Sequence, residues 1–214
     1  DKMHDDAECP IVIESSARFS NAVSSWLTGR TSSTTQRHPP STAQLGHGST
    51  TAFDSATTTT GSGGITVFCL HYAGGSAASF EGGTHGGYEW QSVLAAAPNV
   101  QRVIGVELPG HGTRRNEEPL TDLSAVALDV ICSTGLISLV AEPDKLIEEV
   151  CVDVTIDKSV YSLQKKNDYN GGEFVLLGYS FGALVMHAVA TLLHRHNARQ
   201  QPLHLLVAAE AAPK

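Results

Sequence analysis

Residues 173–193, EFVLLGYSFGALVMHAVATLL, decide the fold, because an apolar run breaks at G-Y-S-F-G and resumes with a different period. The run from Phe174 to Leu177 follows two glycines and is typical of a strand buried on both faces. Beyond the break the apolar residues recur at helical spacing, at Leu184, Val185, Ala188, Val189, Leu192 and Leu193. The stretch therefore predicts a strand, a tight turn at Ser180 and a helix.

Ser180 on such a turn is a candidate nucleophile. A strained strand-to-helix turn exposes the serine hydroxyl at the top of the sheet, and Gly178 and Gly182 leave room where a side chain would clash. The free N–H groups of the following helix point at the same spot and would stabilise an anion formed there. The pattern therefore predicts acyl transfer through Ser180. The alternative is a chance G-x-S-x-G in a chain with 20 glycines.

Composition indicates one globular domain and excludes some partners. The 214 residues are 41% hydrophobic and 17% charged, which is ordinary for a domain with one core. A formal charge of −8 argues against a nucleic-acid or anionic-membrane surface. Arg114 and Arg115 form a local basic pair that could meet an acidic partner, or simply lie in a solvated loop.

The cysteines and the N-terminus predict a cytoplasmic protein without a metal or cofactor. Cys9, Cys69, Cys132 and Cys151 are scattered without C-x-x-C spacing, and Cys69 lies inside an apolar strand pattern as a small hydrophobe. A reducing compartment fits this usage best. No apolar run approaches the length of a membrane span, and the chain begins with an acidic segment where a secretory signal would be basic and then apolar.

Three parts follow from the local composition. Residues 1–30 are an N-terminal segment in which FSNAVSSWLTGR (19–30) suits a short amphipathic element or disorder. Residues 31–64 are dominated by Ser, Thr, Gly and His, and we predict a disordered linker because they bury too little apolar surface to offset the entropy of ordering. Residues 65–214 form the main domain.

Alternating strand and helix patterns in that domain predict an α/β sheet. Buried strands are expected in ITVFCLHYAGGSAASF (65–80) and VQRVIGVELPGHGTR (100–114), and two parallel strands are the natural reading. Thr121 or Asp122 can cap a helix through residues 123–140. Ligands bind such sheets outside the carboxyl ends of the strands, where the loops HYAGG, LPGHG and GYSFG all fall.

An oxyanion hole needs two N–H donors beside the nucleophile. The serine turn offers the backbone N–H of Phe181, and the loop after the earlier strand offers that of Ala73, which Gly74 and Gly75 would allow to approach. An ordinary turn is the alternative reading of A-G-G.

Taken together, these residues resemble the type II thioesterases of the α/β-hydrolase fold. The resemblance runs from Trp26 to Pro213 and rests on four motifs and Trp90: FCLHYAGGSAASF, VELPGHGTRRNEEPLTDL, GYSFGALVMHAVA and LHLLVAAEAAP. It implies a mostly parallel sheet flanked by helices, Ser180 as nucleophile, and the amides of Ala73 and Phe181 as the oxyanion hole. It also implies a substrate acyl group on the phosphopantetheine arm of an acyl carrier protein, in fatty-acid, polyketide or nonribosomal peptide synthesis.

The chain departs from the family pattern at three places. Insertions are expected near residues 81–89 and 142–172, and the second carries both a helical period from Leu146 to Val154 and a strand-like alternation from Val152 to Ile156. The family often has Arg where His111 stands, so we expect His111 to line the entrance rather than to act as a base.

The catalytic base is the missing part of this pattern. In this fold the order is Ser, acid, His, each on a loop at the same end of the sheet. The histidines after Ser180 fall on the predicted helix or at the foot of the next strand: His187, His194, His196 and His204. Glu210 is a weak candidate for the acid. The chain begins with Asp and stops after a core strand, so we expect an N-terminal part whose lid, last strands and catalytic His lie beyond Lys214.

Two consequences and two rivals follow from that expectation. The chain as given should turn over thioesters poorly, with His71 and His111 as the local substitutes for a base. A carboxylesterase or lipase on the same fold would share the serine site. A non-catalytic relative that binds carrier proteins would keep the serine turn without the triad.

Overall fold

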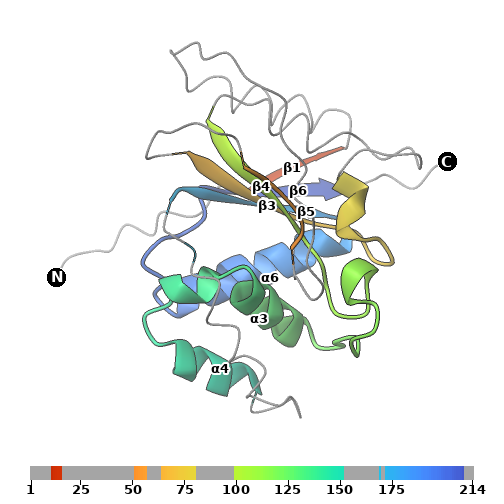
Figure 1. Ribbon diagram of the computed structural model, residues 1–214. Coiled ribbons are helices and arrows are strands. Elements are labelled where there is room, and N and C mark those ends of the chain that lie inside the picture. The colour runs from red at the N-terminus through yellow and green to blue at the C-terminus, as the bar shows by residue number, and fades with distance from the viewer. Residues whose placement is uncertain are drawn as a thin grey trace.

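One sheet organises the part of the chain that the computed structural model describes, namely residues 11–15, 51–56, 64–80, 99–151, 169 and 172–209. Its strand order is β1-β6-β5-β3-β4-β2 (Figure 1). Neighbouring strands run parallel except for β2, which is antiparallel to β4. The strands are β1 Ile11–Ser15, β2 Thr51–Ala56, β3 Ile65–Leu70, β4 Val100–Val106, β5 Phe174–Tyr179 and β6 His204–Ala209.

The helices α3 Leu123–Ser133, α4 Pro143–Cys151 and α6 Phe181–Arg195 lie on the same side of this sheet in Figure 1. Helix α6 packs against the sheet, α3 packs against α6, and α4 packs against α3. Short 3-10 turns lie between the larger elements, at η1 Ala77–Phe80, η2 Gly112–Arg114 and η3 Leu136–Leu139. The prediction of a mostly parallel sheet flanked by helices is confirmed.

The central strand β3 is buried on both faces, as its unbroken apolar sequence predicts. Phe68 and Leu70 belong to the core on the helix side of the sheet. Val67 and Cys69 alternate with them and join a second cluster with Phe80 of η1. The Cys69 thiol is fully buried and behaves as a small core side chain, as expected.

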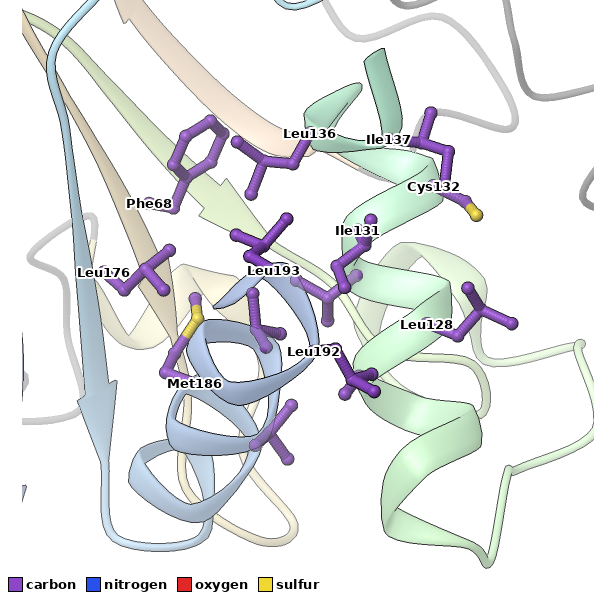
Figure 2. Packing of buried hydrophobic residues seen from close by; sticks show 14 of the residues in the cluster. Phe68, Leu128, Ile131, Cys132, Leu136, Ile137, Leu176, Met186, Leu192 and Leu193 are labelled. Atoms are coloured by element: carbon purple, nitrogen blue, oxygen red, sulfur yellow. The ribbon is translucent and has the colours of Figure 1, made fainter. Parts of the chain in front are cut away.

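The main core lies between the sheet and the pair α3 and α6. Figure 2 shows Met186 and Leu193 of α6 reaching into the space between sheet residues such as Leu176 and the α3 residue Ile131. Burial of each such side chain contributes roughly 1.5–3 kcal/mol. This packing fixes α6, and with it the turn at Ser180, against the sheet.

Helix α3 begins as predicted and ends earlier than predicted. The Asp122 side chain accepts a hydrogen bond from the Ala125 N–H at 2.9 Å, so Asp122 is the N-cap. The helix stops at Ser133 because Gly135 adopts a left-handed φ of 80°, and the following residues form η3.

Helix α6 also corrects one residue of the predicted apolar stripe. Leu184 is 61% exposed, although its neighbour Val185 is fully buried. Each residue is rotated about 100° from the last, which places Leu184 at the edge of the stripe that faces the sheet. The helix ends because Asn197 adopts φ 49°, with hydrogen bonds from the Asn197 and Ala198 N–H groups back to His194 and Leu193.

For two segments the structure differs in part from the prediction. Residues 51–56 form β2 within the predicted 31–64 linker, so that prediction is wrong for these six residues, which pair with β4 instead of remaining free. In the predicted 142–172 insertion, residues 143–151 are the helix α4, and its buried Leu146, Ile147, Val150 and Cys151 follow the helical period. Residues 19–30 and the predicted insertion at 81–89 lie outside the described residues.

Candidate active site

Three strand ends meet at one edge of the sheet. Leu70, the last residue of β3, is in register with Val106 of β4 on one side and with Gly178 of β5 on the other. The chain after β3 continues to β4 on one side of it, whereas the chain after β5 continues to β6 on the opposite side. Loops diverge at such a switch point and leave room for a ligand. The residues that follow the three strands therefore share one site.

Ser180 lies at this edge in a strained backbone conformation. It connects β5 directly to α6, with φ 54° and ψ −113°, and its side chain is exposed. Residues other than glycine adopt such angles at a cost of roughly 1–3 kcal/mol, and persist there when the surrounding structure enforces them. The predicted strand, tight turn and helix are confirmed here, and the hydroxyl is accessible to a reactant.

The two glycines of G-Y-S-F-G enforce this turn by close packing. A Cβ added at Gly178 would lie 2.5 Å from the Ala183 nitrogen in the first turn of α6. A Cβ added at Gly182 would lie 2.6 Å from the His71 carbonyl oxygen and closer still to that of Leu70. Side chains at these positions would push α6 away from β5 and β3. The glycines are therefore needed for the short distance between the serine turn and the end of β3.

The two amides expected to form the oxyanion hole lie on the turns that follow β3 and β5. Ala73 is an exposed residue in a turn closed by a 2.9 Å hydrogen bond from the Gly75 N–H to the Tyr72 carbonyl. Gly74 has φ 76°, which glycine adopts without strain. Phe181 is the first residue of α6, so its N–H has no partner within the helix. Both amides thus lie on the turns at the edge of the sheet where Ser180 lies.

Two tyrosines join these turns. Tyr72 precedes Ala73 and Tyr179 precedes Ser180, and their rings meet edge to face with centroids 5.6 Å apart. Tyr72 is 42% exposed. The contact holds one turn against the other and leaves an aromatic surface beside the serine.

His71 is buried and contacted at both ring nitrogens, unlike a histidine that is free to act as a base. Its side chain is fully buried, its Nδ1 lies 2.8 Å from the Tyr72 carbonyl oxygen, and its Nε2 lies 3.3 Å from Oε1 of Glu107. The angles at Nε2 are not those of a hydrogen bond. Glu107, which follows β4, is also buried and accepts a hydrogen bond from the Ala77 N–H at 3.2 Å.

His111 lies beside this pair and is half-buried. Its ring centroid is 5.2 Å from that of His71, and its Nδ1 lies 3.1 Å from the Pro109 carbonyl oxygen. Because a carbonyl only accepts, Nδ1 carries the proton of this contact. His111 therefore lies in the loop after β4 and against His71, and its role at the entrance stays a prediction.

The described histidines after Ser180 do not reach this edge. His187 lies in the middle of α6, and His194 and the C-cap residue His196 are about 20 Å or more farther along than Ser180 at 1.5 Å per residue. His204 begins β6 in register with Val175, at the amino end of the parallel strands. Glu210 lies outside the described residues.

Arg114 does not form the exposed basic pair that its sequence neighbourhood suggests. It is buried and binds Asp129 of α3 through two hydrogen bonds of 2.6 and 3.0 Å. It also contacts Glu117 at 2.6 Å and donates to the Glu107 carbonyl at 3.1 Å. Burial alone would lower the pKa of Arg114, but the two carboxylates together raise it above its usual value. Only Arg115 of the pair is exposed.

Glu107 and Asp129 are not among the residues that the sequence predicts for the site. A weak signal for each exists, because Glu107 directly follows a buried strand and Asp129 interrupts the apolar pattern of α3. Such carboxylates are buried only when they are paired, and the partners lie far away in the sequence.

The described residues hold no group of three His, Cys, Asp or Glu side chains arranged for a metal ion. None of the helices in this part of the chain is long and apolar enough to cross a membrane.

The sequence of the chain matches a known protein family. Residues 67–213 match the sequence model of the alpha/beta hydrolase family. The gramicidin S biosynthesis protein GrsT of Aneurinibacillus migulanus is 27% identical over 150 residues, which are 70% of this chain and 42% of that protein. The chain thus spans less than half the length of this curated relative.

Solved structures give two further similarities. The RedJ thioesterase from the prodiginine biosynthetic pathway in Streptomyces coelicolor is 26% identical, with 67% of this chain and 38% of that one covered and a TM-score of 0.40. ClbQ from the colibactin NRPS/PKS pathway is 20% identical, with 71% and 48% covered and a TM-score of 0.42.

Proposed function

Because the chain belongs to the alpha/beta hydrolase family, we propose that it carries the nucleophile of a serine thioesterase that releases acyl groups from carrier proteins. The observation that carries the proposal is Ser180 on a strained, exposed turn at the edge where the loop containing Ala73 also lies. GrsT is by its name a gramicidin S biosynthesis protein, which supports a substrate acyl group from a biosynthetic pathway of that kind. The scattered cysteines favour a cytoplasmic location.

The proposed reaction has two steps. The Ser180 hydroxyl attacks the thioester carbonyl, and the N–H groups of Ala73 and Phe181 stabilise the oxyanion until the phosphopantetheine thiol leaves. Water then hydrolyses the acyl-enzyme through a second oxyanion at the same amides. The chemistry needs no cofactor. It needs a general base, and no described histidine after Ser180 lies at this edge. We propose that a residue other than these supplies the base.

Covalent labelling tests the nucleophile separately from turnover. A fluorophosphonate probe should label Ser180, and Ser180→Ala should abolish the adduct in a peptide-level mass spectrum. Ser124→Ala, which removes an exposed serine from α3, is the matched control and should leave labelling unchanged. Labelling that survives Ser180→Ala would refute the assignment.

Turnover separates the thioesterase from its rivals. Acyl-carrier thioesters and simple oxygen esters of the same acyl group should be compared on the 214-residue chain and on the longest natural form that contains it. Preference for the thioester supports the proposal. Preference for the ester would identify a carboxylesterase or lipase, and binding of the carrier without labelling or turnover would identify a binding module.

The same comparison tests the base. The short chain should be much slower than the longer form, although an oxyanion hole and binding alone can leave roughly 10³ to 10⁴-fold catalysis over water. If the two match, and His111→Ala then abolishes turnover, His111 is the base.

A further inference from the structure

The His71–Glu107 pair contacts both ends of the loop that carries Ala73, at Tyr72 and at Ala77. His71 follows β3 and Glu107 follows β4, and the register of Leu70 with Val106 brings the two side by side. Both side chains are at most 2% exposed. A buried acid beside a buried histidine, one strand away from the serine turn, is not used in the reaction proposed above.

The contacts of His71 orient its ring. His71 Nδ1 lies 2.8 Å from the Tyr72 carbonyl, which only accepts, so Nδ1 carries a proton. Nε2, on the other side of the ring, faces Oε1 of Glu107 at 3.3 Å. The Nδ1 contact therefore turns the ring so that Nε2 points towards the Glu107 carboxylate.

The pair connects three segments of the chain to one another. The Tyr72 carbonyl accepts from His71 Nδ1 and also from the Gly75 N–H at 2.9 Å, so two donors orient the turn that contains Ala73. Glu107 accepts from the Ala77 N–H at 3.2 Å, at the other end of the same loop. Gly112 approaches the Glu107 carboxylate so closely that a Cβ there would overlap it.

We propose that His71 and Glu107 are positioning residues that hold the 72–77 loop in the geometry in which the Ala73 N–H faces the acyl oxygen at Ser180. The inference rests on the proposed function. Ala73 and Gly74, at the tip of the loop, are exposed, and a Cβ built on Gly74 would have no neighbour within 4 Å. The position of the tip therefore depends on the contacts at the two ends of the loop, at Tyr72 and Ala77. An oxyanion donor stabilises the transition state only when it is oriented in advance.

Variants that remove one contact at a time test this role. His71→Asn keeps an N–H near the position of Nδ1 for the Tyr72 carbonyl, whereas His71→Leu removes both polar contacts. Glu107→Gln keeps an acceptor for the Ala77 N–H and offers an N–H to His71, whereas Glu107→Met keeps only the volume. Glu149→Gln is the matched control, because Glu149 also faces a buried histidine, His196, with Nε2 and Oε2 3.2 Å apart, at the far end of α6.

Two readouts are measured on each variant, after circular dichroism confirms that it is folded. The first is kcat and KM for an acyl-carrier thioester in the longest natural form. The loss of one oxyanion donor costs about 10² to 10³ in kcat, so a displaced donor should cost about 10 to 100-fold, with KM within a factor of about three. The order expected is a large loss for His71→Leu and Glu107→Met, and a smaller one for His71→Asn and Glu107→Gln.

The second readout is amide hydrogen exchange in residues 72–77, which does not depend on activity. Exchange should rise at least about 10-fold in His71→Leu and stay unchanged in Glu149→Gln. If the wild type is inactive and unlabelled, the proposed function fails, while this measurement still decides whether the pair holds the loop. Unchanged exchange and kcat in His71→Leu and Glu107→Met would overturn the inference. So would faster exchange without loss of kcat, or an equal loss of kcat in Glu149→Gln. Should the leucine variant not fold, the asparagine and glutamine variants give the same comparison.

Discussion

The backbone of Ser180 predicts that glycine is more stable than alanine at this position. Its φ of 54° and ψ of −113° cost a residue with a Cβ roughly 1–3 kcal/mol. Ser180→Ala keeps that strain, whereas Ser180→Gly removes it and adds about 0.5–1 kcal/mol of chain entropy in the unfolded state. The glycine variant should therefore exceed the alanine variant by about 1 kcal/mol in free energy of unfolding.

Urea unfolding followed by circular dichroism measures this difference. If the free energy of unfolding falls by about 2 kcal/mol per molar urea in both variants, their unfolding midpoints should differ by about 0.5 M urea. In thermal unfolding the same difference corresponds to about 2–4 °C for a chain of this size. Thr191 on the exposed side of α6 provides the opposite control, since Thr191→Gly should be about 1 kcal/mol less stable than Thr191→Ala in a helix interior.

The comparison has a clear refuting result. If the alanine variant at position 180 is as stable as the glycine variant, while the Thr191 pair shows the ordinary helical order, Ser180 carries no backbone strain. The turn would then give no support for Ser180 as a nucleophile.

Three other predictions follow from the packing around the site. Gly182→Ala should destabilise the protein by about 1–3 kcal/mol in urea unfolding, because its Cβ would meet backbone carbonyls at the end of β3; a loss below about 0.5 kcal/mol would contradict that close approach. Arg114→Met should lower the free energy of unfolding by about 3–5 kcal/mol, because it leaves Asp129 buried without its partner. Arg115→Met, at an exposed position, should change it by less than about 0.5 kcal/mol. Equal effects of the two substitutions would show that Arg114 is not buried in solution. Burial raises the pKa of the Cys132 thiol to about 12, so iodoacetamide at pH 8 should modify Cys132 only after unfolding, and rapid modification of the folded chain would disprove its burial.

Much of the fold was predictable because its signals are local. The change from a continuous apolar run to a helical period places the turn at Ser180, and Asp122 before an apolar segment marks a helix start. Both effects act within a few residues, through the free N–H groups of a helix and the period of buried side chains. The family resemblance added the expected roles of Ala73 and Phe181, which remain proposals for this chain.

The rest depends on which distant residues meet. Arg114 reads as half of an exposed basic pair, yet it is buried because Asp129 of α3 lies across from it. His71 and Glu107 are 36 positions apart and become neighbours only through the register of β3 and β4. Residues 51–56 read as linker and form an edge strand because β4 offers its free backbone groups. The sequence by itself determined the strand, turn and helix around Ser180, because short-range sterics and hydrogen bonds specify them. Only the tertiary structure decided which charges are buried and paired, because desolvation and pairing depend on side chains that the fold brings together from separate elements.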